Sequence, residues 1–177
     1  MWVTGGAYQA WTGFLDHWAA GGPADGAQLP PLAVEDFDGD TWARLAGRIV
    51  EALDRRLTTW SETLARDLSA ARDEFAAGQV LHRGRQGLGP IRALAATPSL
   101  PVELRTQLES LVDRQIGSVQ DQLEQSVDRM RRAGRPARAV EARLRTIRDN
   151  PLTVAAAPGP AWEAAPADRP RRRVHFE

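Results

Sequence analysis

The sequence predicts an all-α protein built around a long antiparallel helical hairpin, and three observations carry this prediction. Apolar residues recur three and four positions apart over residues 41–81 and again over 101–133, which is the spacing of one face of an α-helix. Both segments repeat their apolar positions every eleven residues, which is typical of nearly straight helices. Glycine and proline gather between them. We therefore expect two long helices that pack side by side.

The first long helix is expected over 41–81, without interruption. The stretch LTTWSETL at 57–64 resembles a break, because its threonines are β-branched and Thr59 to Glu62 fits a capping box. The apolar spacing nevertheless continues through it. Burying Leu57, Trp60 and Leu64 contributes roughly 1.5–3 kcal/mol each, against a propensity cost of about 1–2 kcal/mol for the polar residues. The apolar positions are Trp42, Leu45, Ile49, Leu53, Leu57, Trp60, Leu64, Leu68, Ala71 and Phe75.

The ends of this helix have their own signals. Asp38 or Asp40 is expected to cap its start, where a carboxylate also favours the positive end of the helix dipole. The glycine-rich stretch HRGRQGLGP, residues 82–90, predicts a loop after it. PIRALAATP, which follows, predicts a short helix.

The second long helix is expected over 101–133 and a final helix follows it. Pro101 suits the first turn of a helix, and Gly134 supplies a stop. Arg135 and Pro136 open the last helix, which Asn150 and Pro151 end. The apolar positions of the long helix are Leu104, Leu108, Val112, Ile116, Val119, Leu123, Val127 and Met130.

The N-terminal segment predicts a short aromatic helix over about 7–20. Its apolar stripe consists of Tyr8, Trp11, Leu15 and Trp18, with Phe14 beside it. We expect this helix to dock on the hairpin, and the alternative is that Trp11, Phe14 and Trp18 anchor a partner. The predicted organisation is an aromatic helix (1–22), a linker (23–37) that can pack as an extended strap, a hairpin body (38–150) and a flexible tail rich in proline, alanine and arginine (151–177).

Charge is unevenly distributed along the chain although the formal net charge is zero. Residues 1–128 hold 11 arginines against 18 acidic residues, whereas residues 129–177 hold 12 arginines against 5. There is no lysine. Such asymmetry predicts either contact with an acidic partner or folding of the basic end onto the acidic body.

The motifs of common catalytic and metal sites are missing. The chain has no cysteine, and His17, His82 and His175 lie in unrelated segments without a ligand spacing. Asp36, Asp38 and Asp40 lack the glycine and glutamate of a calcium loop. GRQGLG fits neither a dinucleotide fingerprint nor a phosphate loop. We expect no metal, no cofactor and no enzymatic activity.

No run of about 18 apolar residues occurs, and the N-terminus lacks the pattern of a signal peptide. We therefore expect no membrane segment and a cytoplasmic location.

These observations favour a non-enzymatic helical protein that binds other proteins, as an adaptor, scaffold, assembly factor or subunit of a complex. A homo-oligomer is a further expectation. The candidate partner-binding residues are Trp11, Phe14, Trp18, Arg131, Arg132, Arg135 and Arg138. The alternative is a protein that binds the phosphate backbone of nucleic acid. Its candidate residues are Arg129, Arg131, Arg132, Arg135, Arg171, Arg172 and Arg173.

Overall fold

The computed structural model describes residues 3–21 and 29–153, and within these ranges it is helical without a strand. The all-α prediction is thus confirmed. The elements are α1 (Val3–Ala19), a 3-10 turn η1 (Val34–Asp36), α2 (Gly39–Ala70), α3 (Glu74–Ala95), α4 (Val102–Arg132) and α5 (Ala137–Asp149). The predictions for the tail beyond residue 153, including those for Arg171, Arg172 and Arg173, concern residues outside the described ranges.

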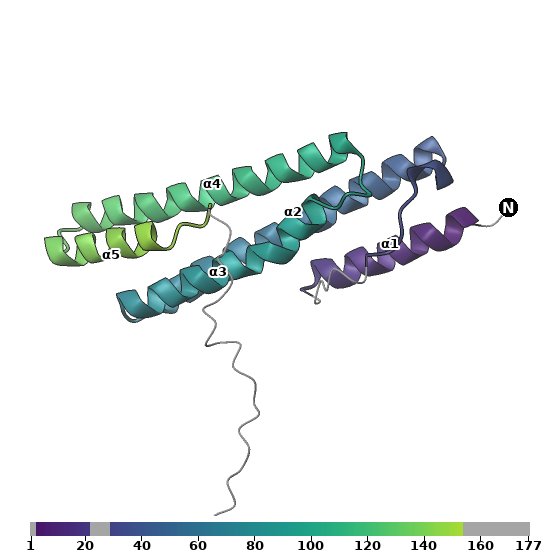
Figure 1. Cartoon of the computed structure of the whole chain (residues 1–177). Helices are drawn as coiled ribbons and strands as arrows, with labels where there is room; N and C mark the ends of the chain where they lie inside the picture. The colour runs from purple at the N-terminus through teal and green to yellow at the C-terminus, as the bar shows by residue number, and fades with distance from the viewer. Residues whose placement is uncertain (1–2, 22–28, 154–177) are drawn as a thin grey trace, which may run out of the picture.

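The helices form an elongated bundle in which the chain doubles back at each turn after α2 (Figure 1). α3 returns along α2, α4 returns along α3, and α5 returns along α4. α1 lies beside α2 and begins at the same end of the molecule. Consequently α2 and α4 run in the same direction, and the antiparallel partner of α2 is α3.

The first long helix ends earlier than the apolar spacing predicted. α2 is continuous through residues 57–64, and Thr58 and Thr59 are exposed, as expected. It ends at Ala70 rather than at 81, because Ala71 is extended and Asp73 starts a new helix. The Asp73 carboxylate accepts a hydrogen bond from the Ala76 amide at 2.7 Å. Phe75, predicted on the buried face, is 76% exposed.

The loop predicted over 82–90 is wrong, because these residues lie inside α3. The glycines there allow close packing against α2. A Cβ atom at Gly84 would lie 2.7 Å from Cδ1 of Leu64, and the Trp60 indole donates to the Gly84 carbonyl at 2.8 Å. Pro90 removes one backbone donor, yet the helix continues to Ala95. The short helix predicted after the loop is the end of α3.

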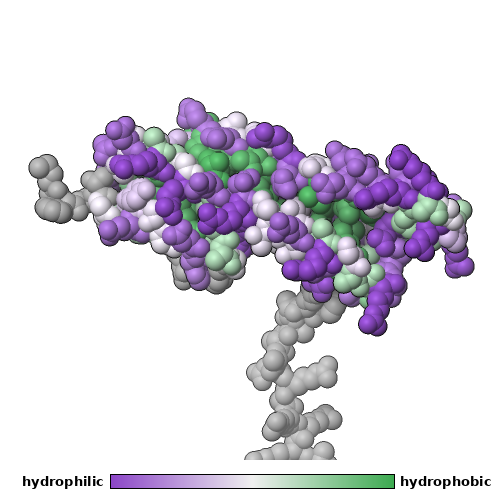
Figure 2. Space-filling view, turned by 180° about the vertical axis from the view of Figure 1, so that it is seen from behind, coloured by the Kyte–Doolittle hydropathy of each residue, from purple (hydrophilic) through white to green (hydrophobic). Residues whose placement is uncertain are grey.

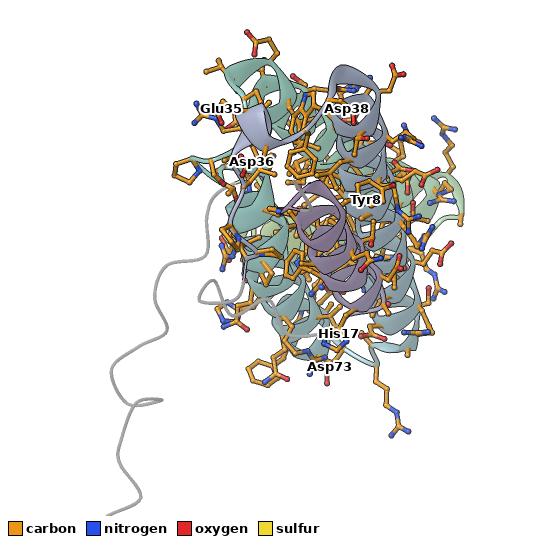
Figure 3. All side chains as sticks on the ribbon, turned by 90° about the vertical axis from the view of Figure 1, so that its right-hand side faces the viewer. Tyr8, His17, Glu35, Asp36, Asp38 and Asp73 are labelled. Atoms are coloured by element: carbon orange, nitrogen blue, oxygen red, sulfur yellow. The ribbon has the colours of Figure 1, made fainter. Side chains whose placement is uncertain are left out.

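The start of α2 and the ends of α4 and α5 follow their sequence signals. Asp38 caps α2 by accepting from the amide of Thr41 at 2.8 Å and from its hydroxyl at 2.9 Å. Figure 3 shows Asp38 with Glu35 and Asp36 where the chain enters α2. Gly134 ends α4 with a φ of 67°, a conformation that favours glycine. α5 ends at Asp149, beside the predicted stop.

The aromatic helix α1 packs against the core. Trp11 and Trp18 are buried, and the Trp11 indole donates to the carbonyl of Pro31 at 3.3 Å. Residues 29–37 form a strap, in which Phe37 is buried and Leu29 and Leu32 are partly buried. Among the described helices, none combines the length and apolar character needed to cross a membrane.

Candidate interaction surface

Five exposed arginines gather at the turn between α4 and α5, and we call this cluster the arginine tip. It lies at the end of the molecule opposite the start of α2 (Figure 1). The turn is rigidly built, because the Gly134 amide donates to Arg131 O and the Arg135 amide donates to Met130 O, both at 3.1 Å. The members of the tip are Arg129, Arg131, Arg132, Arg135 and Arg138.

The helix dipoles act differently on the two sides of the tip. Arg129, Arg131 and Arg132 occupy the last turn of α4, where cations stabilise the negative end of the helix. Arg138 lies in the first turn of α5, whose positive end disfavours a cation. This start has Pro136 at the cap position, no side-chain cap hydrogen bond and no acidic residue in its first turn. The α5 side therefore concentrates positive potential without local compensation.

Few acidic groups of the described residues neutralise the tip. Arg131 pairs with Asp128 at 2.9 Å, and the other four arginines form no ion pair within residues 3–21 and 29–153. The basic residue that does fold onto the acidic body is Arg143, which binds Glu74 of α3 at 2.9 Å. The tip itself faces solvent.

A polar hollow of about 460 Å³ adjoins the tip on the outer side of α4. It is lined by Gln122, Gln125, Asp128, Arg129 and Arg132. Guanidinium and amide groups donate several hydrogen bonds each, so this surface matches carboxylates or phosphates better than apolar groups.

The predicted aromatic residues lie elsewhere. Trp11 and Trp18 are buried against this same chain, and Phe14 is partly buried with its ring edge-on to Trp11 at 5.8 Å. α1 also lies away from the arginine tip (Figure 1). The structure thus does not bring the two predicted groups together, and partner binding by the aromatic group stays a prediction.

Two surface features were not predicted from the sequence. The first is Phe75, which is exposed at the start of α3 although its spacing places it on the apolar face. Figure 2 shows hydrophobic areas between hydrophilic ones on the rear face of the molecule. A groove bordered by α1, α2 and α3 is the second feature; it depends on contacts between helices that are distant in sequence.

Within the described part of the chain, no group of His, Cys, Asp and Glu side chains could hold a metal.

Comparison with known proteins adds no relative to this picture. No family model matches the chain, and no similar curated protein or solved structure was found.

Proposed function

We propose that this chain is a non-enzymatic helical interaction protein, an adaptor or a subunit of a larger assembly, that binds an acidic protein surface through the arginine tip. The observation that carries the proposal is the set of exposed arginines around the uncapped start of α5. Like charges held this close repel one another, and among the described residues the Asp128 carboxylate and the negative end of α4 offset this cost on the α4 side alone.

An acidic protein partner would relieve this repulsion. Guanidinium groups bind carboxylates with two parallel hydrogen bonds, and such charge-assisted bonds are stronger than neutral ones. The tip also presents its cations from two helices and the short, hydrogen-bonded turn that joins them. Binding therefore costs little conformational entropy of the backbone. It contains no histidine and no unpaired carboxylate, which is why the proposal assigns it recognition and not proton transfer.

Nucleic acid is the second candidate partner, favoured by the absence of any acidic residue between Arg129 and Val140. Phosphates could then approach the whole turn. No aromatic side chain lies in the tip to stack on a base, and for this reason we rank the protein partner first.

The test is co-purification of the full chain from its own cells, before and after nuclease treatment. The decisive variant is Arg132→Glu/Arg135→Glu/Arg138→Glu. Its matched control is Arg55→Glu/Arg72→Glu/Arg114→Glu, which makes the same charge change at exposed arginines outside the tip. The proposal predicts a stoichiometric protein that the control retains and the tip variant loses, with retention that weakens as salt rises.

Three outcomes would count against the proposal. Equal retention by both variants would show that the tip does not bind the partner. Absence of any retained protein would contradict the proposal of a stable protein partner. Loss of retention on nuclease treatment, with salt-sensitive binding of a DNA or RNA duplex, would support the second candidate. The homo-oligomer and the cytoplasmic location remain predictions. The molecular mass in solution tests the first, and cell fractionation tests the second.

A further inference from the structure

The groove between the end of α1, α2 and α3 shares no residue with the arginine tip. It has a volume of about 330 Å³, which at about 30 Å³ per water-sized group leaves room for one large side chain. Its apolar wall consists of Trp60 and Leu64 from α2 with Val80 and Ile91 from α3. An apolar side chain placed there would be covered from both helices.

Hydroxyl groups lie at the rim of the groove beside this wall. Thr59 and Thr63 are one helical turn apart on α2, and both line the groove. The Thr59 hydroxyl donates to the carbonyl of Arg55 at 3.1 Å, and a hydroxyl oxygen that donates one bond can still accept others. The tryptophan side chain combines a large apolar ring with one N–H donor that needs a partner when buried. It therefore fits this groove better than an aliphatic side chain does.

The described part of the chain ends close to the groove. α5 packs on α3, and the side-chain nitrogen of Asn150 would lie 3.5 Å from a Cβ atom at Gly78. Val80, in the apolar wall, follows two positions later, about 3 Å along the helix axis. A second hollow is lined by both Asn150 and Gly78, and it shares Arg83 with the groove. The segment that follows residue 153 therefore starts within reach of the groove.

The residues outside the described ranges include three large aromatic side chains, Trp2, Trp162 and Phe176. Trp2 precedes α1, whose other end borders the groove, and this helix of 17 residues is about 26 Å long. Trp162 follows Thr153 by nine positions, which can span up to about 30 Å. Phe176 follows by 23 positions, and the longer loop costs more closure entropy. Chain length thus favours Trp162.

We propose that the groove binds the C-terminal segment of the same chain, with the indole of Trp162 against Trp60 and Val80 and its N–H directed to the threonine hydroxyls. The Trp60 ring offers a fixed surface, because its hydrogen bond to the Gly84 carbonyl holds it in place. Trp162 is the one large apolar residue between positions 155 and 173, so the segment gains most by burying it. Docking within one chain also benefits from an effective concentration on the order of millimolar.

Fluorine NMR of the full chain labelled with 5-fluorotryptophan tests the proposal, with a soluble neutral gadolinium chelate as the probe of solvent exposure. The resonance lost in Trp162→Phe is that of Trp162. Gly87→Leu fills the groove, because a Cβ atom there lies 3.4 Å from Cδ1 of Trp60. Gly47→Leu is the matched control at an exposed position inside α2, with nothing within 4 Å of the new Cβ. Both changes replace a helical glycine by a better helix former, so neither should destabilise its helix through propensity.

The Trp162 resonance of the parent protein should be shielded from the chelate at every protein concentration. Gly87→Leu should lower the ratio of docked to free segment at least about tenfold and raise the relaxation of Trp162 toward that of free 5-fluorotryptophan. Gly47→Leu should leave the shielding unchanged. The tip variant Arg132→Glu/Arg135→Glu/Arg138→Glu should also leave it unchanged, so failure of this proposal and failure of the proposed function can be told apart.

A parent protein whose Trp162 is as accessible to the chelate as free 5-fluorotryptophan would overturn the proposal. Equal shielding in Gly87→Leu and Gly47→Leu would overturn the location in the groove. Shielding that increases with protein concentration would assign the groove to the segment of a second copy and would overturn docking within one chain.

Discussion

The α2–α3 contact contains glycines inside a helix, and the arginine tip contains a cluster of like charges. Packing explains the glycines, whereas no packing contact explains the arginines. In the contact, two glycines inside a helix face Trp60 and Leu64, and the Trp60 indole is hydrogen-bonded to Gly84. In the tip, the arginines face solvent and four of them form no ion pair within the described chain. The glycines of the first region cost helix propensity and improve packing, whereas the arginines of the second repel one another and form one ion pair, Arg131 with Asp128, within the described chain.

If the proposed function holds, this difference separates the residues that stabilise the fold from those that bind the partner. Substitutions at the α2–α3 contact should change stability and leave partner binding intact at temperatures where the protein is folded. Substitutions at the tip should weaken retention of the proposed partner without lowering stability.

The largest effect is expected at Gly84. Gly84→Val forces side-chain atoms into the space of Leu64, whose Cδ1 would lie 2.7 Å from the new Cβ. Overpacking of this kind costs about 1–3 kcal/mol. Urea denaturation should therefore show a lower free energy of unfolding than for Gly47→Val, which makes the same change at an exposed position inside α2 with nothing within 4 Å of the new Cβ. Equal free energies for the two variants would mean that Gly84 has no packing role.

A smaller loss is expected from Trp60→Phe. This change removes the donor to the Gly84 carbonyl, and a hydrogen bond contributes about 0.5–1.5 kcal/mol to stability. Trp42→Phe is the control, because Trp42 is also partly buried on α2 and contacts Phe37 but has no hydrogen bond to a described residue. The free energy of unfolding should fall further for Trp60→Phe than for Trp42→Phe. Equal losses would assign the role of Trp60 to burial alone.

The two regions also differ in how far the sequence could predict them. The apolar spacing predicted α4 and most of α2, because these helices bury one continuous face. The break between α2 and α3 was missed since Ala70, Ala71 and Arg72 contain no glycine or proline, and Phe75 continued the spacing. The available signal was Asp73, a preferred capping residue.

The glycines of α3 predicted a loop for a different physical reason. Their role is to allow close packing against Trp60 and Leu64, which lie twenty or more positions away in sequence, whereas local propensity favours a loop at glycine. The same holds for the groove, whose walls come from three helices. The arginine tip was visible as composition, but its exposure and the uncapped start of α5 required the structure.

At the tip, a small gain in stability is expected from Arg138→Glu. The change places a carboxylate in the first turn of α5, where no acidic residue is present, and such a charge stabilises a helix by about 0.3–1 kcal/mol. Retention of the proposed partner should fall in the same variant. Arg145→Glu, an exposed position further along α5, should show neither effect. A loss of stability in Arg138→Glu would mean that this arginine has a structural role and would break the separation.

The smallest effect is expected at the start of α2, which has the local compensation that the start of α5 lacks. Hydrogen bonds from the amide and then the hydroxyl of Thr41 lower the pKa of the Asp38 carboxyl. A carboxyl whose pKa is lower in the folded than in the unfolded state adds stability above its unfolded pKa, and that stability is lost as pH falls through the folded pKa. Asp38→Asn keeps a capping side chain without the charge. The unfolding midpoint of this variant should lie below that of the parent protein at neutral pH, and the difference should shrink as pH falls below about 4. A constant difference across that range would show that the charge of Asp38 does not contribute to stability.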